Sequence, residues 1–487
     1  MSDSDLGGVL MALSVVLAAA HATGYIFERL RQPRLVGEIL AGILLGPFVM
    51  GRIAPEAYAT LFGQAAGADR TGVVLGFVYW FGLIFLMFIS GSQVRGVLAE
   101  ENRGQTAWIL GVGTPLPFFL VLALGLFSVL PIDPLVGAAG ERMATLLVLS
   151  IAVAVTSIPV ISRIFYDLRI MHTRFASLIL GAAVFEDIVL WAVLAVATAL
   201  AGAAALPEGD VVRAVSSHVG ATMAYVTLAL FVMPRVVRAV SRWRWNVFRK
   251  SSPLGYVVLV LFVYGAVAAL LKVNMVFSAF LAGYGVVGGI GGTERERFAP
   301  VLQAIEQFAA ATFVPMYFVL VGHRLVFGAA FSLPMLLVFV AGSSLLALLS
   351  VALGARAAGF RGLDVVNIAV TTNARGGPGI VLASVAYDAG IINAAFYTTL
   401  VLAAVITSQA AGVWLRMVLS RGWPLLASNP EETWLPKGAR APQSAAQTQS
   451  AAQTQAAPLT TVSVGEAPVA RPKELSVSGS GGVRGEG

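Results

Sequence analysis

Residues 185–191 read F-E-D-I-V-L-W and place two adjacent carboxylates, Glu186 and Asp187, inside an apolar run at about 176–202. If this run is a membrane-spanning helix, Asp187 lies about 16 Å into a hydrocarbon layer about 30 Å thick. Ionisable groups at that depth are costly, and by default they indicate a site that binds a cation or a proton. The alternative is a buried salt bridge that only fixes the packing of helices.

The composition of the chain is typical of a membrane protein. Of its 487 residues, 58% are hydrophobic and 12% are charged, whereas soluble domains carry about 25% charged residues. Because apolar runs of about 18 or more residues recur along the chain, the net charge of +7 is interpreted as an orientation signal and not as a sign of nucleic-acid binding. No cysteine is present, which excludes disulfides and thiolate metal sites.

Thirteen apolar spans are predicted, so the expected fold class is an all-α polytopic membrane protein. If the N-terminus is outside, the inner loops and span ends hold 18 Lys and Arg residues and the outer ones hold 6. This bias predicts an outer N-terminus and a cytoplasmic C-terminus. The predicted spans are 6–27, 35–51, 72–93, 106–130, 144–166, 176–202, 218–237, 254–271, 274–291, 302–322, 332–353, 364–386 and 391–415.

The end of the chain differs in composition from the rest. Residues 426–487 are rich in Ala, Gln, Ser, Thr, Gly and Pro, and S-A-A-Q-T-Q occurs twice in succession at 444–455. Such a segment cannot bury enough apolar surface to fold. We therefore predict a membrane domain at 1–425 and a disordered cytoplasmic tail at 426–487. No cofactor is predicted, because the tail is too short and too polar for a nucleotide-binding domain.

Two of the predicted spans are interrupted near their middle. The fifth contains T-S-I-P at 156–159, where the proline removes a backbone donor and the hydroxyls are able to pair freed backbone groups or bind a cation. The twelfth contains T-T-N-A-R-G-G-P-G at 371–379, which would break almost any helix. Single kinks are common in membrane helices. Two breaks in register, however, indicate a transporter site between inverted repeats, here at about 6–202 and 254–415.

Six motifs carry a family resemblance. They are L-V-G-E-I-L-A-G-I-L-L-G-P at 35–47, T-S-I-P-V-I-S-R-I at 156–164, E-D with a following Trp at 186–191, F-S-A-F-L-A-G at 277–283, F-V-P-M-Y-F at 313–318 and N-A-R-G at 373–376. From about residue 8 to residue 418, the chain resembles the cation:proton antiporters of the sodium/hydrogen exchanger superfamily, on the bacterial monovalent-cation branch. The resemblance implies the sodium/proton antiporter fold, with crossed broken helices and a core that moves against a scaffold. It also implies a homodimer in the bacterial cell membrane that exchanges Na⁺ or K⁺ for protons.

The resemblance also implies where the site lies. It assigns cation and proton binding to Asp187, with Glu186 as the second carboxylate and the hydroxyls of Thr156 and Ser157 beside them. The oxygens of Asp187 would hold Na⁺ or K⁺ in competition with a proton. The supporting residues are Pro159, Arg163, Asn373 and Arg375.

Departures from the family pattern leave parts of the function open. Relatives often have an acid where this chain has Gln93, and the eleventh span has no Lys or Arg to pair with the two acids. Arg375 or Arg163 is an alternative partner, and Arg375 is equally able to neutralise helix-end carbonyls at the break. Glutamate at position 186 leaves the exchange ratio open. Proton-coupled export of a small organic cation or metabolite therefore remains the alternative function.

Other functional classes fit the sequence less well. An intramembrane enzyme is not expected, because H-E-x-x-H and G-x-S-x-G are absent. Channels usually select ions with symmetric rings or carbonyl filters, whereas inverted broken helices favour a carrier.

Asp388 lies near a span end, and we expect it to be solvated.

Overall fold

The structure of the chain is a computed structural model. It describes residues 3–30, 32–63, 70–93, 103–157, 161–162, 164–165, 168–171, 173–203, 208–243, 245–247, 251–289, 294–328 and 331–427. Among these residues every regular element is a helix, and nine helices are long and apolar enough to cross a membrane. The predicted all-helical membrane fold is therefore confirmed, while the number of thirteen spans stays a prediction. The predicted tail lies outside the described residues, except for Leu426 and Ala427.

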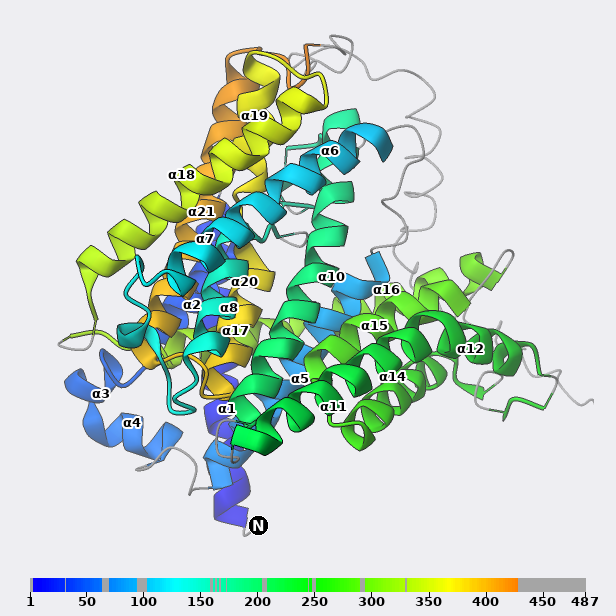
Figure 1. The fold of residues 1–487 in the computed structure, drawn as a ribbon. Coiled ribbons are helices and arrows are strands. Elements are labelled where there is room, and N and C mark those ends of the chain that lie inside the picture. Colours follow the sequence, from blue (N-terminus) through cyan, green and yellow to red (C-terminus); the bar gives the residue numbers. More distant parts are fainter. Residues whose placement is uncertain are drawn as a thin grey trace, which may run out of the picture. The chain divides into compact units, whose positions relative to one another are not determined.

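Most of the helices pack in two groups (Figure 1). The flanking group contains α1 (Asp3–Arg29), α2 (Arg34–Leu45), α3 (Met50–Ile53), α4 (Pro55–Phe62), α5 (Arg70–Gln93), η4 (Leu228–Val232), α12 (Met233–Arg242), α14 (Pro253–Leu270), α15 (Met275–Gly289), α16 (Glu294–Ala311) and α17 (Phe313–His323). The broken-helix group contains α6 (Arg103–Gly113), α7 (Pro115–Leu126), η3 (Asp133–Leu135), α8 (Arg142–Ala154), α10 (Arg174–Ala203), α18 (Leu333–Ala357), α19 (Leu363–Thr372), α20 (Gly376–Asp388) and α21 (Ala394–Ser420).

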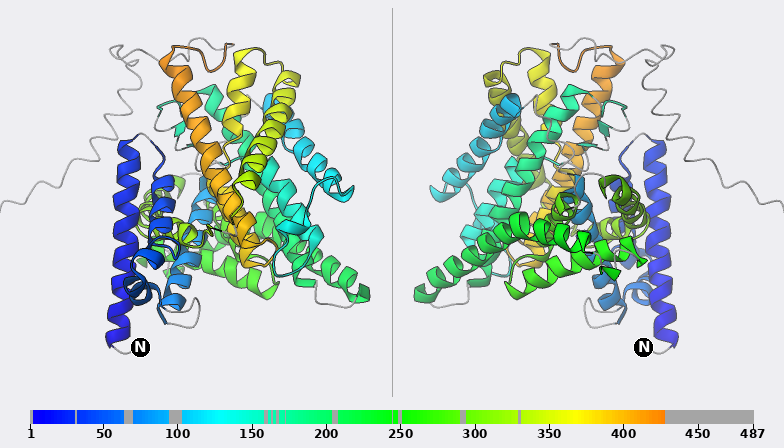
Figure 2. Two further views of the ribbon diagram at one scale, coloured as in Figure 1. Left: turned by 90° about the vertical axis from the view of Figure 1, so that its left-hand side faces the viewer. Right: turned by 90° about the vertical axis from the view of Figure 1, so that its right-hand side faces the viewer.

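Helix α11 (Glu208–Thr227) connects the two groups. Among the described residues, no helix of one group packs extensively on a helix of the other. Helix α10 of the broken-helix group packs on the connecting helix α11. Figure 2 shows α1 of the flanking group and α6 of the broken-helix group at opposite edges of the described part. The two groups are therefore separate layers that contact each other mainly through side chains.

Capping residues explain where several long helices begin. Ser252, Ser332 and Asn393 each precede a helix and accept a hydrogen bond from the backbone N–H three residues later, at 3.1, 3.2 and 2.9 Å. A helix leaves its first N–H groups without an intrahelical partner, and a capping side chain pairs one of them. For the same reason, a proline fits in the first turn of α14 and α18.

Glycines bring the helix backbones of the flanking group into contact. At the crossing of α2 and α17, a Cβ atom on Gly42 would lie 2.0 Å from the Val319 carbonyl oxygen, and one on Gly322 would lie 2.1 Å from the Ile39 oxygen. Helices α5 and α15 cross in the same way, at Gly91 and Gly283. Small residues at such crossings drive helix association in membranes, where the hydrophobic effect does not. The flanking group is thus held by backbone-to-backbone packing.

Replacing Gly322 by alanine should destabilise the folded protein by about 1–3 kcal/mol, because the added methyl group must push two backbones apart. The measurement is the temperature of unfolding of the purified protein in detergent. Gly111→Ala is the matched control, since nothing lies within 4 Å of a Cβ atom there. Equal unfolding temperatures for the two variants would contradict the close crossing of α2 and α17.

Candidate functional site

Both predicted helix breaks are present. Helix α8 ends at Ala154, and residues 155–157 are not helical. Helix α19 ends at Thr372, and α20 begins only at Gly376. Gly376 has a φ of +32°, a backbone conformation that side-chain-bearing residues rarely adopt. The sequence therefore located the two breaks correctly.

The two broken segments meet and pair with each other. The hydroxyl of Thr156 donates to the Thr372 carbonyl oxygen at 2.7 Å, and the N–H of Ser157 donates to the Ala374 carbonyl oxygen at 2.8 Å. Within a membrane, unpaired backbone groups cost several kcal/mol each. Each break therefore supplies partners for the other.

Helix α21 caps the start of α20 at this crossing. The hydroxyl of Ser408 accepts from the N–H of Gly376 at 3.0 Å, and that of Thr407 accepts from the N–H of Arg375 at 3.4 Å. These hydroxyls replace the capping residue that a helix normally takes from its own chain. The start of α20 is thereby fixed next to the end of α8.

The acidic pair lies on α10, which packs against α8, α19 and α20. Glu186 and Asp187 are 2% and 1% exposed. Thr156 lies beside the Glu186 carboxylate. In the described part of the chain, Glu186 Oε2, Asp187 Oδ1 and Asn373 Oδ1 are buried and accept no hydrogen bond. Unpaired buried oxygens are rare in folded proteins and call for an explanation, such as a missing ion or a catalytic role.

Thr114 is a site residue that the sequence reasoning missed. It lies between α6 and α7, and its buried hydroxyl donates to Glu186 Oε1 at 2.7 Å. Like the hydroxyls of residues 156–157, it precedes a proline, Pro115, inside an apolar span. That shared pattern is the sequence signal that could have identified it.

Arg375 is buried at the crossing and contacts α18. Its Nη1 donates to Ser343 Oγ of α18 at 2.7 Å, and its guanidinium lies 5.6 Å from the ring centroid of Phe339. Its Nε and Nη2 make no hydrogen bond with any described residue. In this structure, Arg375 therefore pairs neither with the acidic pair nor with helix-end carbonyls. The other two supporting residues, Pro159 and Arg163, lie outside the described residues.

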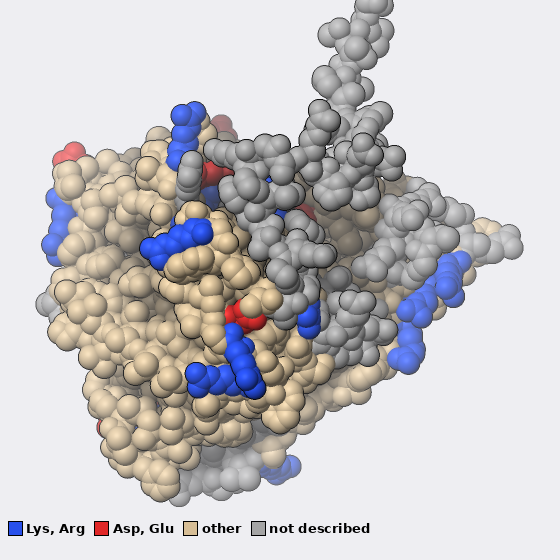
Figure 3. Space-filling model, turned by 90° about the horizontal axis from the view of Figure 1, so that it is seen from above, with Lys and Arg blue, Asp and Glu red and all other residues tan. Residues whose placement is uncertain are grey.

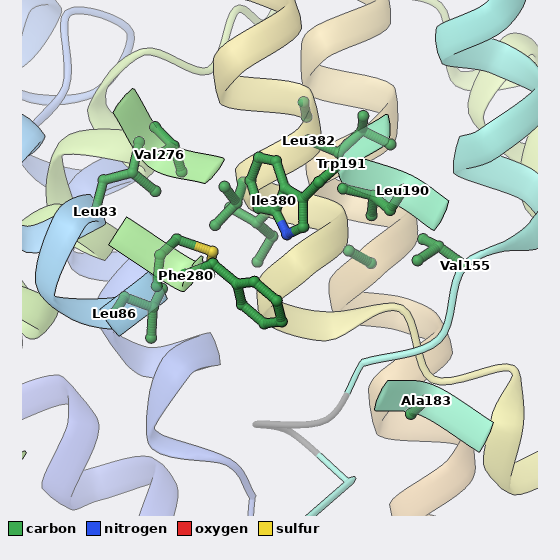
Figure 4. Close-up of a cluster of buried hydrophobic side chains, with 14 of the residues drawn as sticks. Leu83, Leu86, Val155, Ala183, Leu190, Trp191, Val276, Phe280, Ile380 and Leu382 are labelled. Atoms are coloured by element: carbon green, nitrogen blue, oxygen red, sulfur yellow. The ribbon is translucent and has the colours of Figure 1, made fainter. Parts of the chain in front are cut away.

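Next to the acids, the two helix groups meet through an apolar surface. Trp191, one turn after Asp187, stacks on Phe277 of α15 with ring centroids 6.1 Å apart. Figure 4 shows Trp191, Ile380 and Phe280 in one buried cluster. Such a contact has no directional bonds between the groups.

A polar junction joins the two groups at the end of α20. Arg324 Nη1 pairs with Asp388 Oδ1 at 2.7 Å, and the Tyr79 hydroxyl donates to Asp388 Oδ2 at 3.0 Å. The Arg324 guanidinium also lies 4.1 Å from the ring centroid of Tyr79. Asp388 is exposed, as expected, but its side chain is 20% accessible and also carries an ion pair, which the sequence did not predict.

Comparison with known families identifies the chain. The family described as "Sodium/hydrogen exchanger, transmembrane" matches residues 13–421. The chain belongs to this family. The predicted resemblance is thereby confirmed for most of the sequence.

Named relatives of this sodium/hydrogen exchanger family member are antiporters. "Cation/H(+) antiporter 18" of Arabidopsis thaliana is 26% identical over 327 residues, covering 66% of this chain and 37% of the plant protein. "Na(+)/H(+)-K(+) antiporter GerN" of Bacillus cereus is 23% identical over 404 residues, covering 82% of this chain and 92% of that protein. The expectation of a transporter and not an enzyme is confirmed. The chain spans little more than a third of the length of the plant relative.

A solved structure shows the same fold. The sodium proton antiporter MjNhaP1 of Methanocaldococcus jannaschii matches with a TM-score of 0.61 at 15% sequence identity, covering 85% of this chain and 98% of that one. This likeness confirms the antiporter fold for this family member. At this identity it says nothing of the ion that is carried.

Replacing Thr114 by valine removes the donor to Glu186 while keeping the shape of the side chain. We expect the cation concentration at half-maximal proton flux to rise about tenfold, since a hydrogen bond to a charged group contributes about 1.5–3 kcal/mol. Flux into proteoliposomes at several cation concentrations measures this. Thr114→Ser keeps the hydroxyl and should match the wild type. An unaltered cation dependence in Thr114→Val would show that this hydrogen bond does not support the site.

Proposed function

We propose that this chain exchanges a monovalent cation, Na⁺ or K⁺, for protons. The observation that carries the proposal is the buried pair Glu186 and Asp187, whose free oxygens lie beside two crossed broken helices. Two adjacent buried carboxylates without a cationic partner among the described residues are costly unless a proton or a cation neutralises them. The relatives that are named as cation/H⁺, Na⁺/H⁺-K⁺ and K⁺/H⁺ antiporters support the same assignment.

A proton and a cation that compete for the same carboxylate oxygens are exchanged without a second binding site. Asp187 holds either a proton or the cation, and Glu186 supplies the second carboxylate. Oxygen ligands replace the hydration shell of Na⁺ or K⁺, and the further candidates at the crossing are the hydroxyls of Thr156 and Ser157 and the amide oxygen of Asn373. Binding of a cation releases the proton, and binding of a proton releases the cation.

Alternating access would come from movement of one helix group against the other. Backbone contacts lock the flanking group at its glycines, and hydrogen bonds lock the crossing inside the broken-helix group. Between the groups lie side-chain contacts, including the Tyr317 hydroxyl with Ser384 at 3.2 Å and the Tyr397 hydroxyl with the Val321 oxygen at 3.2 Å. Such contacts can be exchanged without breaking a helix.

The setting of the protein is part of the proposal. We place it in the bacterial plasma membrane as a homodimer, with the N-terminus outside and the C-terminus cytoplasmic. The charge bias of the loops supports the orientation, and the family resemblance supports the dimer. The alternative substrate is a small organic cation or metabolite, for which the departure at Gln93 leaves room.

Asp187→Asn should reduce cation-driven proton flux to the background, because an amide cannot take up and release a proton. The measurement uses proteoliposomes that hold a pH gradient, to which Na⁺, K⁺ and Li⁺ are added separately. Asp133→Asn is the matched control, since the side chain of Asp133 is 79% exposed and lies outside the site.

Two outcomes would contradict the proposal. Flux that persists in folded Asp187→Asn would remove Asp187 from the site. A wild-type protein that is folded but responds to none of the three ions would exclude cation exchange and favour the organic exporter. Circular dichroism and gel filtration establish that each protein is folded.

Asp388→Asn should loosen the junction and open the predicted outer side more often. Because the chain has no cysteine, Ser384→Cys supplies a single label position in the broken-helix group beneath the junction. We expect a membrane-impermeant maleimide to react with this cysteine about tenfold faster when Asp388 is replaced, since a charge-assisted hydrogen bond is lost.

The control for this experiment is Asp133→Asn with the same cysteine. Asp133 pairs with Arg142 at 3.4 Å, and both residues belong to the same helix group. The rate of the maleimide reaction should therefore not change. Equal rates in the Asp388 and Asp133 variants would show that the junction does not hold the groups together.

A further inference from the structure

Helix α12 is the last part of the continuous helical segment that begins with α11 and connects the two groups. Helix α11, the π-helical turn η4 and α12 follow one another without a gap. Pro234 accounts for the wide turn, because a proline clashes with the carbonyl group four residues earlier and removes one hydrogen bond. The Tyr264 hydroxyl donates to the Ala229 carbonyl oxygen in this turn at 3.1 Å. The direction of α12 is thus fixed by α14.

Three arcs of different chemistry run along α12, as judged from about 100° per residue. The packed arc lies against α15 and holds Pro234, Val237 and Ser241, all of them buried. The basic arc spans about 60° and holds Arg235, Arg238 and Arg242, all of them exposed. The apolar arc holds Val232, Val236, Val240 and Trp243, all of them also exposed.

The arginines of the basic arc are held by backbone carbonyls. Arg238 Nη2 donates to the Gly288 oxygen at 2.8 Å, which caps the end of α15, and Arg235 Nη1 donates to the Phe231 oxygen. Within the described ranges, no carboxylate pairs with Arg235, Arg238 or Arg242. Several of their donors therefore have no carboxylate partner among the described residues.

The apolar arc and the residues after α12 fit the boundary of a bilayer. Val236 and Val240 are 45% and 38% exposed, and Trp243 and Trp245 are 61% and 66% exposed. Tryptophan is enriched at the level of the lipid head groups. The helix that ends in α12, Gly220–Arg242, is long and apolar enough to cross a membrane, so its apolar arc lies among the acyl chains and its basic arc lies near the head groups.

We propose that α12 and Trp243 form a binding site for an anionic phospholipid. The phosphate of the lipid would accept hydrogen bonds from Arg235 and Arg242, and its acyl chains would cover the apolar arc. Figure 3 shows Lys and Arg side chains in a row along the edge where α12 lies in Figure 1. A soluble polyanion would match the arginines but would leave the valines exposed to water, so the lipid fits both arcs.

The excess of Lys and Arg on the predicted cytoplasmic side, which indicates the orientation in the membrane, does not by itself require three arginines on one arc of α12. Charge counting along the sequence is satisfied by arginines on any face of a helix end. Here the spacing i, i+3, i+7 puts all three on one arc, next to a continuous apolar arc. The spacing therefore points to one specific ligand position.

The test is a titration of the full chain in nonionic detergent with phosphatidylglycerol or phosphatidylcholine, followed by native mass spectrometry. Arg235→Gln with Arg242→Gln should weaken phosphatidylglycerol binding about thirtyfold, since each basic residue near an anionic surface contributes about 1 kcal/mol and two are removed. Phosphatidylcholine binding should not change. Arg238 is left in place because it caps α15.

The matched control replaces two other exposed arginines, Arg356 and Arg361, by glutamine. This control should retain phosphatidylglycerol binding, as should Arg235→Lys with Arg242→Lys, which keeps the charge and guards against a folding defect. An equal loss in the control, or no loss in the glutamine variant, would overturn the proposal. So would displacement of the lipid by an equal concentration of glycerophosphoglycerol, the soluble head group, because the acyl chains would then contribute nothing.

Discussion

The rest of the structure depends on one constraint, that backbone groups freed by two helix breaks must find partners away from water. The breaks satisfy it by crossing: Ser157 donates to the Ala374 oxygen and Thr156 to the Thr372 oxygen. Because the crossing fixes where α8 ends and α20 begins, it also fixes which helix faces are left for α10. The position of Asp187 beside the crossing follows from this packing and not from the sequence of α10 alone.

The crossing also determines which charges lie near the acidic pair. Helix ends carry partial charges, negative at the C-terminus and positive at the N-terminus, and α8 and α19 both end here while α20 begins here. Arg375 adds a full positive charge but points it toward Ser343 of α18. No fixed cation among the described residues pairs with the acids, and for this reason we propose that a proton or a diffusing cation neutralises them.

The sequence predicts the fold and the breaks because hydropathy, proline and glycine act through neighbouring residues. It also finds Asp187, since a carboxylate inside an apolar run is conspicuous by itself. Contacts between residues far apart in the sequence cannot be predicted in this way. Thr114 meets a carboxylate 72 residues away, and Asp388 meets Arg324 from 64 residues away. No local pattern encodes the partner, which is why the ion pair of Asp388 was not predicted.

The contacts within and between the two helix groups differ in kind, and that difference decides which of them can change. At Gly42 and Gly322 the backbones touch, so any shift of α2 along α17 would lose packing along the whole crossing. Between the groups lie a stacked pair of rings, two hydrogen bonds made by tyrosines, and the Arg324–Asp388 ion pair. An apolar stack slides at little cost because it has no directional bonds, whereas an ion pair is either formed or broken. A structure built this way should have discrete states, with the Arg324–Asp388 pair as the contact that separates them.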